Sequence, residues 1–166
     1  MAFPVQVYIY DLSQGMARPL GPTLGAIGLP NLEGVWHTSI VVHGTEFFFG
    51  TSGINECIPG TTKLGQPLEK KFLGNTSIDM NTLTLYLRQI GQTEYVIAFM
   101  SVSFTESKKK LCCRFQGTKY DLFKHNCNTF SSSLTKFLGV HDVPNHILTL
   151  PNEVLSTPLA AILGNV

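Results

Sequence analysis

Cys127 stands between two asparagines, directly before a segment with the spacing of an amphipathic helix. Phe130, Leu134 and residues 137–138 would share one helical face, and Gly139 follows them as glycine commonly follows a helix C-terminus. The pattern predicts a helix that begins at Cys127. Unpaired N–H groups and the positive end of the helix dipole favour a thiolate there, so Cys127 is a candidate nucleophile. The alternative is a buried cysteine that packs as a small hydrophobic residue.

A cysteine nucleophile needs a base, which is usually an imidazole far away in the sequence and close in the fold. His37 begins a β-rich run beside the only tryptophan, on an element rigid enough to hold an imidazole in place. The other four histidines lie at a predicted turn, too close to Cys127, or in a proline-broken tail: His43, His125, His141 and His146. We therefore predict that His37 and Cys127 form a catalytic pair. The alternative for His37 is a packed histidine with structural hydrogen bonds.

The composition excludes several other classes of protein. A formal net charge of +1 supplies no basic field for a phosphate backbone, so we expect no nucleic-acid partner. No apolar run approaches the roughly 18 residues that a transmembrane helix needs. The N-terminal residues lack the charged and apolar regions of a signal peptide, which predicts a cytoplasmic and nuclear protein. The four cysteines would then be reduced, and their spacing does not match a zinc site, so we expect no disulfide, metal or cofactor.

The chain has 166 residues, 43% of them hydrophobic, which predicts one domain over residues 1–166. Period-two alternation predicts a strand at 4–12, and two β-rich runs predict a hairpin over 36–50 with Gly44 in its turn. Helical spacing predicts a helix that ends at Gly91 and is capped by Asp79 or Asn81.

The other segments carry weaker patterns. Glycine and proline predict a surface connection over 15–34, with one short helix at 21–27, and a loop over 51–67. Residues 94–116 resemble a hairpin, and 118–123 a short strand. Prolines 144, 151 and 158 predict a broken C-terminal tail from about residue 144, with short helical pieces around 152–156 and 159–163.

Five blocks of the sequence together resemble the PPPDE peptidase family. They contain a Gly-x-Trp-His motif and an Asn-Cys-Asn motif in the family's order, and they extend from residue 5 to about 158: YIYDLSQGMAR, LEGVWHTSIVV, EFFFGTSGI, YDLFKHNCNTFS and LPNEVLSTP. The resemblance implies an α+β fold of the circularly permuted papain-like type, with an antiparallel sheet packed against helices. It also implies that the histidine precedes the cysteine, as His37 precedes Cys127.

The activity implied by this resemblance is hydrolysis through an acyl-enzyme on Cys127. The substrates would be target proteins that carry the small ubiquitin-like modifier SUMO on lysines, and ubiquitin-like shuttle proteins and a homodimer are possible assemblies. One alternative is a thioesterase that removes palmitoyl groups from protein cysteines with the same two residues. Another is an inactive adaptor that only binds ubiquitin-like proteins.

One block departs from the family pattern. Family members pass quickly from the helix that ends near Gly91 to the phenylalanine and glycine matched here by Phe115 and Gly117. This chain carries some twenty further residues, about 95–114, which include Cys112 and Cys113. We predict that this block is an insertion whose two ends meet at the surface.

Overall fold

The computed structural model describes residues 1–26, 32–91 and 114–157. Its five strands form one sheet in the order β4-β3-β2-β1-β5, and all neighbouring strands are antiparallel. The strands are β1 (Phe3–Asp11), β2 (Trp36–Val42), β3 (Thr45–Gly50), β4 (Gly53–Cys57) and β5 (Glu69–Thr76). The helices are α1 (Ala17–Ala26), α2 (Met80–Gly91), α5 (Cys127–Leu138) and α6 (Asn145–Leu155), with a 3-10 turn η1 at Gly117–Lys119. The predicted α+β class with an antiparallel sheet packed against helices is confirmed.

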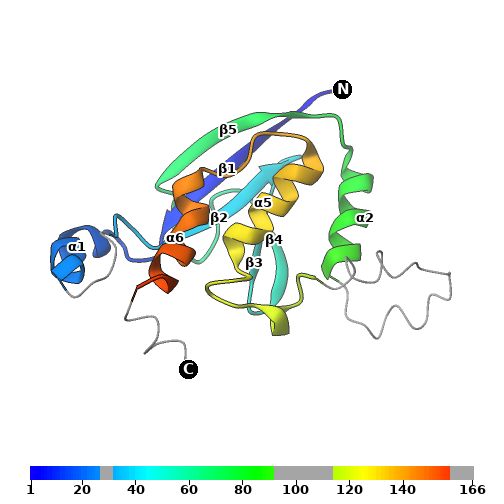
Figure 1. Ribbon diagram of the computed structural model, residues 1–166. Coiled ribbons are helices and arrows are strands. Elements are labelled where there is room, and N and C mark those ends of the chain that lie inside the picture. The colour runs from blue at the N-terminus through cyan, green and yellow to red at the C-terminus, as the bar shows by residue number, and fades with distance from the viewer. Residues whose placement is uncertain (27–31, 92–113, 158–166) are drawn as a thin grey trace.

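Helices α5 and α6 lie over one face of the sheet, while α1 and α2 lie toward opposite ends of the molecule (Figure 1). Helix α5 packs on β2 and β3, and α2 contacts β4. None of the helices in the described residues is long and apolar enough to cross a membrane.

The alternation in β1 divides its side chains between two clusters. Val5, Val7 and Ile9 belong to the main core, which includes Phe130 and Leu134 of α5. The intervening Tyr8 and Tyr10 form a second cluster with Val41. The predicted strand is therefore confirmed, and both of its faces are largely buried.

The β2–β3 hairpin is also as predicted. His43 and Gly44 both have positive φ, at 52° and 72°, as the two central residues of a type I′ turn require. The turn sets the register that pairs Val42 with Thr45 and Val41 with Glu46.

Two edge strands were not predicted. Residues 51–67, expected to form a loop, contain β4, which turns back on β3 and pairs with it along its length. Strand β5 pairs with β1 at the opposite edge of the sheet, although residues 69–72 are exposed. Edge strands have partners on one side only and tolerate polar residues, so their sequences lack the alternation that reveals inner strands.

The helix predictions had mixed outcomes. Helix α2 ends at Gly91 as predicted, and Asp79 accepts a hydrogen bond from the Thr82 N–H at 2.9 Å. Helix α1 extends over ten residues around Pro22, so it is longer than the short helix expected at 21–27. Residues 118–123 do not form a strand, because they contribute to η1 and to a turn closed by one bridge between Asp121 and His125.

The prediction that Pro151 breaks the tail is wrong, because α6 continues through it from Asn145 to Leu155. A proline removes one N–H donor from a helix. Ile147, one turn earlier, is fully buried in the main core, and this packing holds the helix in place. The expected piece at 159–163 lies outside the described residues.

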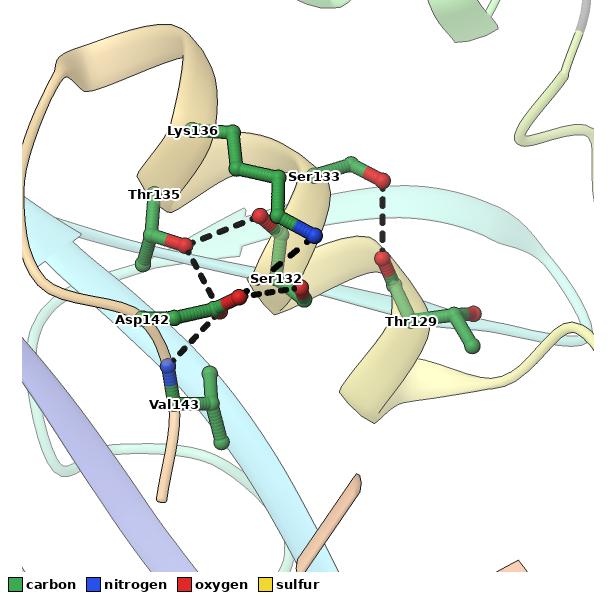
Figure 2. A network of polar contacts seen from close by, with 7 residues as sticks. All are labelled: Thr129, Ser132, Ser133, Thr135, Lys136, Asp142 and Val143. Atoms are coloured by element: carbon green, nitrogen blue, oxygen red, sulfur yellow. Dashed lines mark hydrogen bonds and ion pairs between the residues drawn. The ribbon is translucent and has the colours of Figure 1, made fainter. Parts of the chain in front are cut away.

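Asp142 fixes the turn between α5 and α6 (Figure 2). Its carboxylate accepts hydrogen bonds from the Ser132 and Thr135 hydroxyls at 2.9 and 3.0 Å and from the Val143 N–H at 2.8 Å. Lys136 forms an ion pair with it at 3.5 Å. These contacts tie the C-terminal half of α5 to the segment that leads into α6, so the helix that begins at Cys127 is anchored at both ends.

The flanks of the predicted insertion meet. The Phe115 N–H donates to the Ile90 carbonyl oxygen at 2.8 Å, so the chain returns to the point where α2 ends. The predicted hairpin over 94–116 and nearly all of the block 95–114 lie outside the described residues, as do Cys112 and Cys113.

Candidate active site

Cys127 is the first residue of α5, and local hydrogen bonds fix the helix start at this position. The Asn126 side chain accepts from the N–H groups of Asn128 and Thr129 at 2.9 and 3.1 Å. In return, the Thr129 hydroxyl accepts from the Asn126 N–H at 2.9 Å, which completes a capping box. The predicted helix start is confirmed, and Gly139 ends the helix in the left-handed conformation, as expected.

The side chain of Asn128 joins the start of α5 to β2. Its oxygen accepts a hydrogen bond from the Thr38 hydroxyl at 2.9 Å, and its nitrogen donates to the Trp36 carbonyl oxygen at 3.1 Å. The Cys127 thiol also donates to the side-chain oxygen of Asn128, at 3.6 Å. Trp36 and Thr38, the neighbours of His37, are therefore both hydrogen-bonded to Asn128, which follows Cys127.

The sulfur of Cys127 lies beside an unpaired edge of β2. Strand β3 pairs with β2 only at residues 40–42, which leaves the edge from Trp36 to Ser39 open. The Thr38 N–H donates a hydrogen bond to the Cys127 sulfur. Because strand N–H groups lie close to the plane of the sheet, the sulfur lies beside this open edge of β2.

The His37 side chain lies on the face of the sheet opposite Thr38. Its ring meets the rings of Tyr10 and Phe48 edge-on, each at a centroid distance of 5.9 Å. His37 is only 9% exposed, and its Nε2 is buried without a hydrogen-bond partner. Thr62 Oγ1, His125 Nε2 and Ser131 Oγ are also buried without a partner, so this feature does not by itself distinguish His37. Asn128 thus connects Cys127 with the residues on both sides of His37, but no hydrogen bond joins His37 Nε2 to the Cys127 sulfur, so the pairing of the two remains a prediction.

Gly34 explains the spacing of the Gly-x-Trp-His motif. A Cβ atom at this position would lie 2.5 Å from a ring carbon of Trp36, so only glycine lets the indole pack against the backbone. The indole also meets the ring of His146 from α6 edge-on at 6.3 Å. A groove of about 450 Å³ opens beside this indole, lined by Tyr10, Asp11, Gln14, Arg18, Glu33 and Gln66 among others.

The electrostatics of Cys127 differ from our expectation. The helix start was expected to favour the thiolate, but burial raises the pKa of Cys127 above its ordinary value. The N–H groups of Thr38 and Asn128 and the Tyr120 side chain act in the opposite direction and lower this pKa. With 3% exposure, desolvation outweighs these donors, so the resting residue is a thiol.

Burial also dominates at His37. It lowers the pKa of the imidazole to about 4, and the negative charge of Glu46 opposes this shift. At neutral pH the resting imidazole is therefore neutral and can accept a proton.

Three residues at this site were missed in the sequence. Asn128 is the second asparagine of the Asn-Cys-Asn motif, and a side-chain amide directly after a candidate nucleophile was a usable signal. Tyr120 lies in a segment misread as a strand; burial, together with the charge of Cys127, raises its pKa to about 12. Glu46 carries the one charge in an apolar run, and its partners come from distant segments.

The other histidines have structural contacts. His125 stacks on Phe115 at 4.6 Å, and its Nδ1 is 3.0 Å from the Lys119 carbonyl oxygen. His43 bonds the Ile78 carbonyl oxygen through Nε2 at 3.0 Å. Within the described ranges, His, Cys, Asp and Glu do not cluster in a way that could hold a metal ion.

Comparisons with known proteins identify similar sequences. A family model described as the PPPDE putative peptidase domain matches residues 3–165. Desumoylating isopeptidase 1 of Rattus norvegicus is 44% identical over 161 residues, which cover 97% of this chain and 82% of the relative. The Homo sapiens protein of the same name is 42% identical with the same coverage. The Xenopus laevis protein is 41% identical over 159 residues, covering 96% of this chain and 80% of the relative.

Proposed function

The chain belongs to the PPPDE peptidase family, and on this premise we propose that it is a cysteine isopeptidase that releases SUMO from lysines of target proteins. Cys127 is the nucleophile and His37 the general base. The name of the relatives supports SUMO as the modifier. The observation that carries the proposal is the position of Asn128, which binds the backbone before His37, the side chain after it and the thiol of Cys127.

In this proposal His37 takes the proton from the Cys127 thiol, and the sulfur attacks the carbonyl carbon of the isopeptide bond. The carbon–nitrogen bond then breaks, and the imidazolium returns its proton to the lysine amine, which leaves. Water next attacks the thioester while His37 accepts one of its protons. The sulfur–carbon bond breaks, the modifier leaves with a free carboxylate, and the proton on His37 restores the thiol.

The donors around the sulfur support this chemistry. The N–H groups of Thr38 and Asn128 and the Tyr120 side chain stabilise negative charge at the sulfur. Negative charge appears on the carbonyl oxygen close to the same atoms during attack, and preorganised donors stabilise it there. The buried, neutral His37 is the acceptor that the first proton transfer requires.

Hydrolysis of two substrates tests the proposal: a SUMO-conjugated protein and an S-palmitoylated peptide. We expect the wild-type chain to cleave the SUMO conjugate, Cys127→Ala to abolish cleavage, and the matched control Cys57→Ala to retain it. Hydrolysis of the palmitoyl thioester alone would replace the isopeptidase by a thioesterase. Binding of ubiquitin-like proteins without either hydrolysis would instead indicate an adaptor.

A further inference from the structure

Glu46 is a carboxylate in an unusual place. Its side chain is fully buried at 0% exposure, in β3 beneath the sheet face that carries His37. In the described part of the chain, the one ion pair is that of Lys136 with Asp142, so Glu46 has no basic partner there. Burying an unpaired charge is costly, and a retained buried carboxylate therefore calls for a reason.

Three hydrogen bonds hold the carboxylate in one position. The Tyr10 hydroxyl and the Ser39 hydroxyl donate to Oε1 at 2.7 and 2.6 Å, and the Gly60 N–H donates to Oε2 at 2.7 Å. These donors come from β1, β2 and the segment after β4. Hydrogen bonds of this kind are strongest when the acceptor is an ionised carboxylate.

The same groups surround His37. Tyr10 is the direct cross-strand partner of His37 in the β1–β2 register, and Ser39 lies two residues further along the same face. The Tyr10 ring that contacts the imidazole thus carries the hydroxyl that binds Glu46. Phe48, the other ring against His37, lies two residues after Glu46 on β3. His37 therefore sits in an apolar pocket whose nearest fixed negative charge is Glu46.

We propose that Glu46 is a positioning residue that acts through His37: its fixed carboxylate stabilises the imidazolium that forms when Cys127 gives up its proton. The inference rests on the proposed function of His37 as the base. The hydroxyls of Tyr10 and Ser39 hold the carboxylate in place, and Glu46 is completely buried.

The electrostatics of the neighbouring groups support this role. Tyr10 on β1 contacts the imidazole with its ring, Glu46 on β3 acts on its pKa, and Cys57 on β4 acts on the pKa of Tyr10. Glu46 raises the pKa of His37 against the effect of burial, and it also raises the pKa of Cys57. The groups that act on the pKa of Cys127 are instead Thr38, Asn128 and Tyr120. The charge of Glu46 therefore acts on the base rather than on the nucleophile.

The test is Glu46→Gln, which keeps the shape and an acceptor oxygen but removes the charge. The titration of the His37 imidazole is followed by NMR between pH 3 and pH 8, and iodoacetamide labelling of Cys57 is followed by peptide mass spectrometry. Without Glu46 the imidazolium is less stable, so the pKa of His37 should fall about one unit below its wild-type value. Cys57 should label faster, because the charge that raised its pKa is gone.

The direction of the change at His37 separates this role from a structural one. A variant that is merely loosened would expose the imidazole and raise its pKa toward the ordinary value of 6.5, and that result would overturn the proposal, as would an unchanged pKa of His37. Glu56→Gln is the matched control, since it removes an equal charge from an exposed position on β4, and it should leave both profiles unchanged. If Glu46→Gln does not fold, Ser39→Ala removes one donor to the carboxylate and should lower the pKa of His37 in the same direction.

The titration needs no substrate, so its outcome is independent of whether the chain cleaves SUMO conjugates. If cleavage is absent while the pKa of His37 falls in Glu46→Gln, the proposed function fails and the effect of Glu46 on His37 stands. If cleavage occurs and the pKa of His37 does not change, the reverse holds.

Discussion

Asn128 links the two predicted catalytic residues through one amide group. Its oxygen and nitrogen bind the Thr38 hydroxyl and the Trp36 carbonyl oxygen, both of which lie in or beside the buried sheet. Replacing Asn128 with alanine leaves these groups without partners, and each buried unsatisfied group is destabilising by about 1–3 kcal/mol. We therefore expect Asn128→Ala to lower the free energy of unfolding by about 2 kcal/mol or more and to reduce hydrolysis strongly.

The measurements are chemical denaturation and turnover of a SUMO conjugate. Ser133→Ala is the matched control, because its hydroxyl bonds only the Thr129 carbonyl oxygen within the same helix at 2.9 Å (Figure 2). Equal effects of the two substitutions on stability and turnover would show that Asn128 has no special role at this site.

His37 should make stability depend on pH. Its pKa is about 4 in the folded protein and 6.5 in the unfolded chain, so the unfolded chain binds the proton first as the pH falls. Neutral His37 therefore contributes to the free energy of unfolding fully above about pH 6.5. This contribution, up to about 3 kcal/mol, is lost progressively as the pH falls toward 4.

Melting temperatures between pH 4 and pH 8 measure this dependence. His37→Gln should show a shallower loss of melting temperature below pH 6.5 than the wild type does. His141→Gln, which changes an exposed histidine, serves as the control and should follow the wild-type curve. A His37→Gln curve parallel to the wild type throughout would contradict the assignment.

The residues of the site differ in how far the sequence could reveal them. Cys127 and His37 were predictable because their signals are local: a helix start and a β-rich run beside tryptophan. The raised pKa of Cys127 was not predictable, because it depends on how deeply the helix start is buried. Glu46 and Tyr120 escaped notice because their roles come from contacts across strands and turns.

At the scale of elements, Gly117 holds η1 against the turn between β3 and β4. A Cβ atom at this position would lie 2.1 Å from the Thr51 carbonyl oxygen and 2.8 Å from the Gly53 nitrogen. Both are backbone atoms and cannot rotate away, so η1 must move from the sheet. We expect Gly117→Ala to destabilise the fold by about 1–3 kcal/mol.

Urea denaturation measures this effect, with Gly50→Ala as the control. Gly50 lies at the end of β3, and a Cβ atom there would meet nothing within 4 Å. Similar stability of the two variants would mean that η1 yields easily and does not depend on this close approach.

The elements that the sequence predicted are those with strong internal periodicity, namely β1, the β2–β3 hairpin, α2 and α5. The strands β4 and β5 are defined by pairing with β3 and β1, and their own side chains are largely polar or exposed. Helix α6 persists through Pro151 because Ile147 is buried in the core. The elements that local sequence patterns did not predict are therefore stabilised by tertiary contacts.

At the scale of the whole molecule, the site is assembled by packing α5 across β2 and β3, so its geometry depends on the entire core (Figure 1). The order of histidine before cysteine and the α+β class followed from the family resemblance. The link between β2 and the start of α5 through Asn128 could not be predicted, because it joins residues 90 positions apart in the sequence. A homodimer remains a proposal, and sedimentation of the full chain would test it.

The predicted insertion at 95–114 should be removable from this assembly. Its flanks already meet, since the Phe115 N–H is bonded to the Ile90 carbonyl oxygen at 2.8 Å. Joining Glu94 to Phe115 leaves three residues, 92–94, to span that short gap. Loop length changes closure entropy by only about 0.6 kcal/mol per doubling, so we expect a melting temperature within a few degrees of the full chain and unchanged Cys127 labelling.

Phe115→Ala in the full chain is the control, because it shows whether the thermal melt detects the loss of a core side chain. Phe115 is 1% exposed and packs against Phe49 and Phe130, so its truncation should destabilise the fold by about 3–5 kcal/mol. A shortened chain that melts like Phe115→Ala, or that does not fold, would show that the block supplies core contacts and is no insertion. A shortened chain that folds and cleaves a SUMO conjugate faster than the full chain would identify the block as inhibitory.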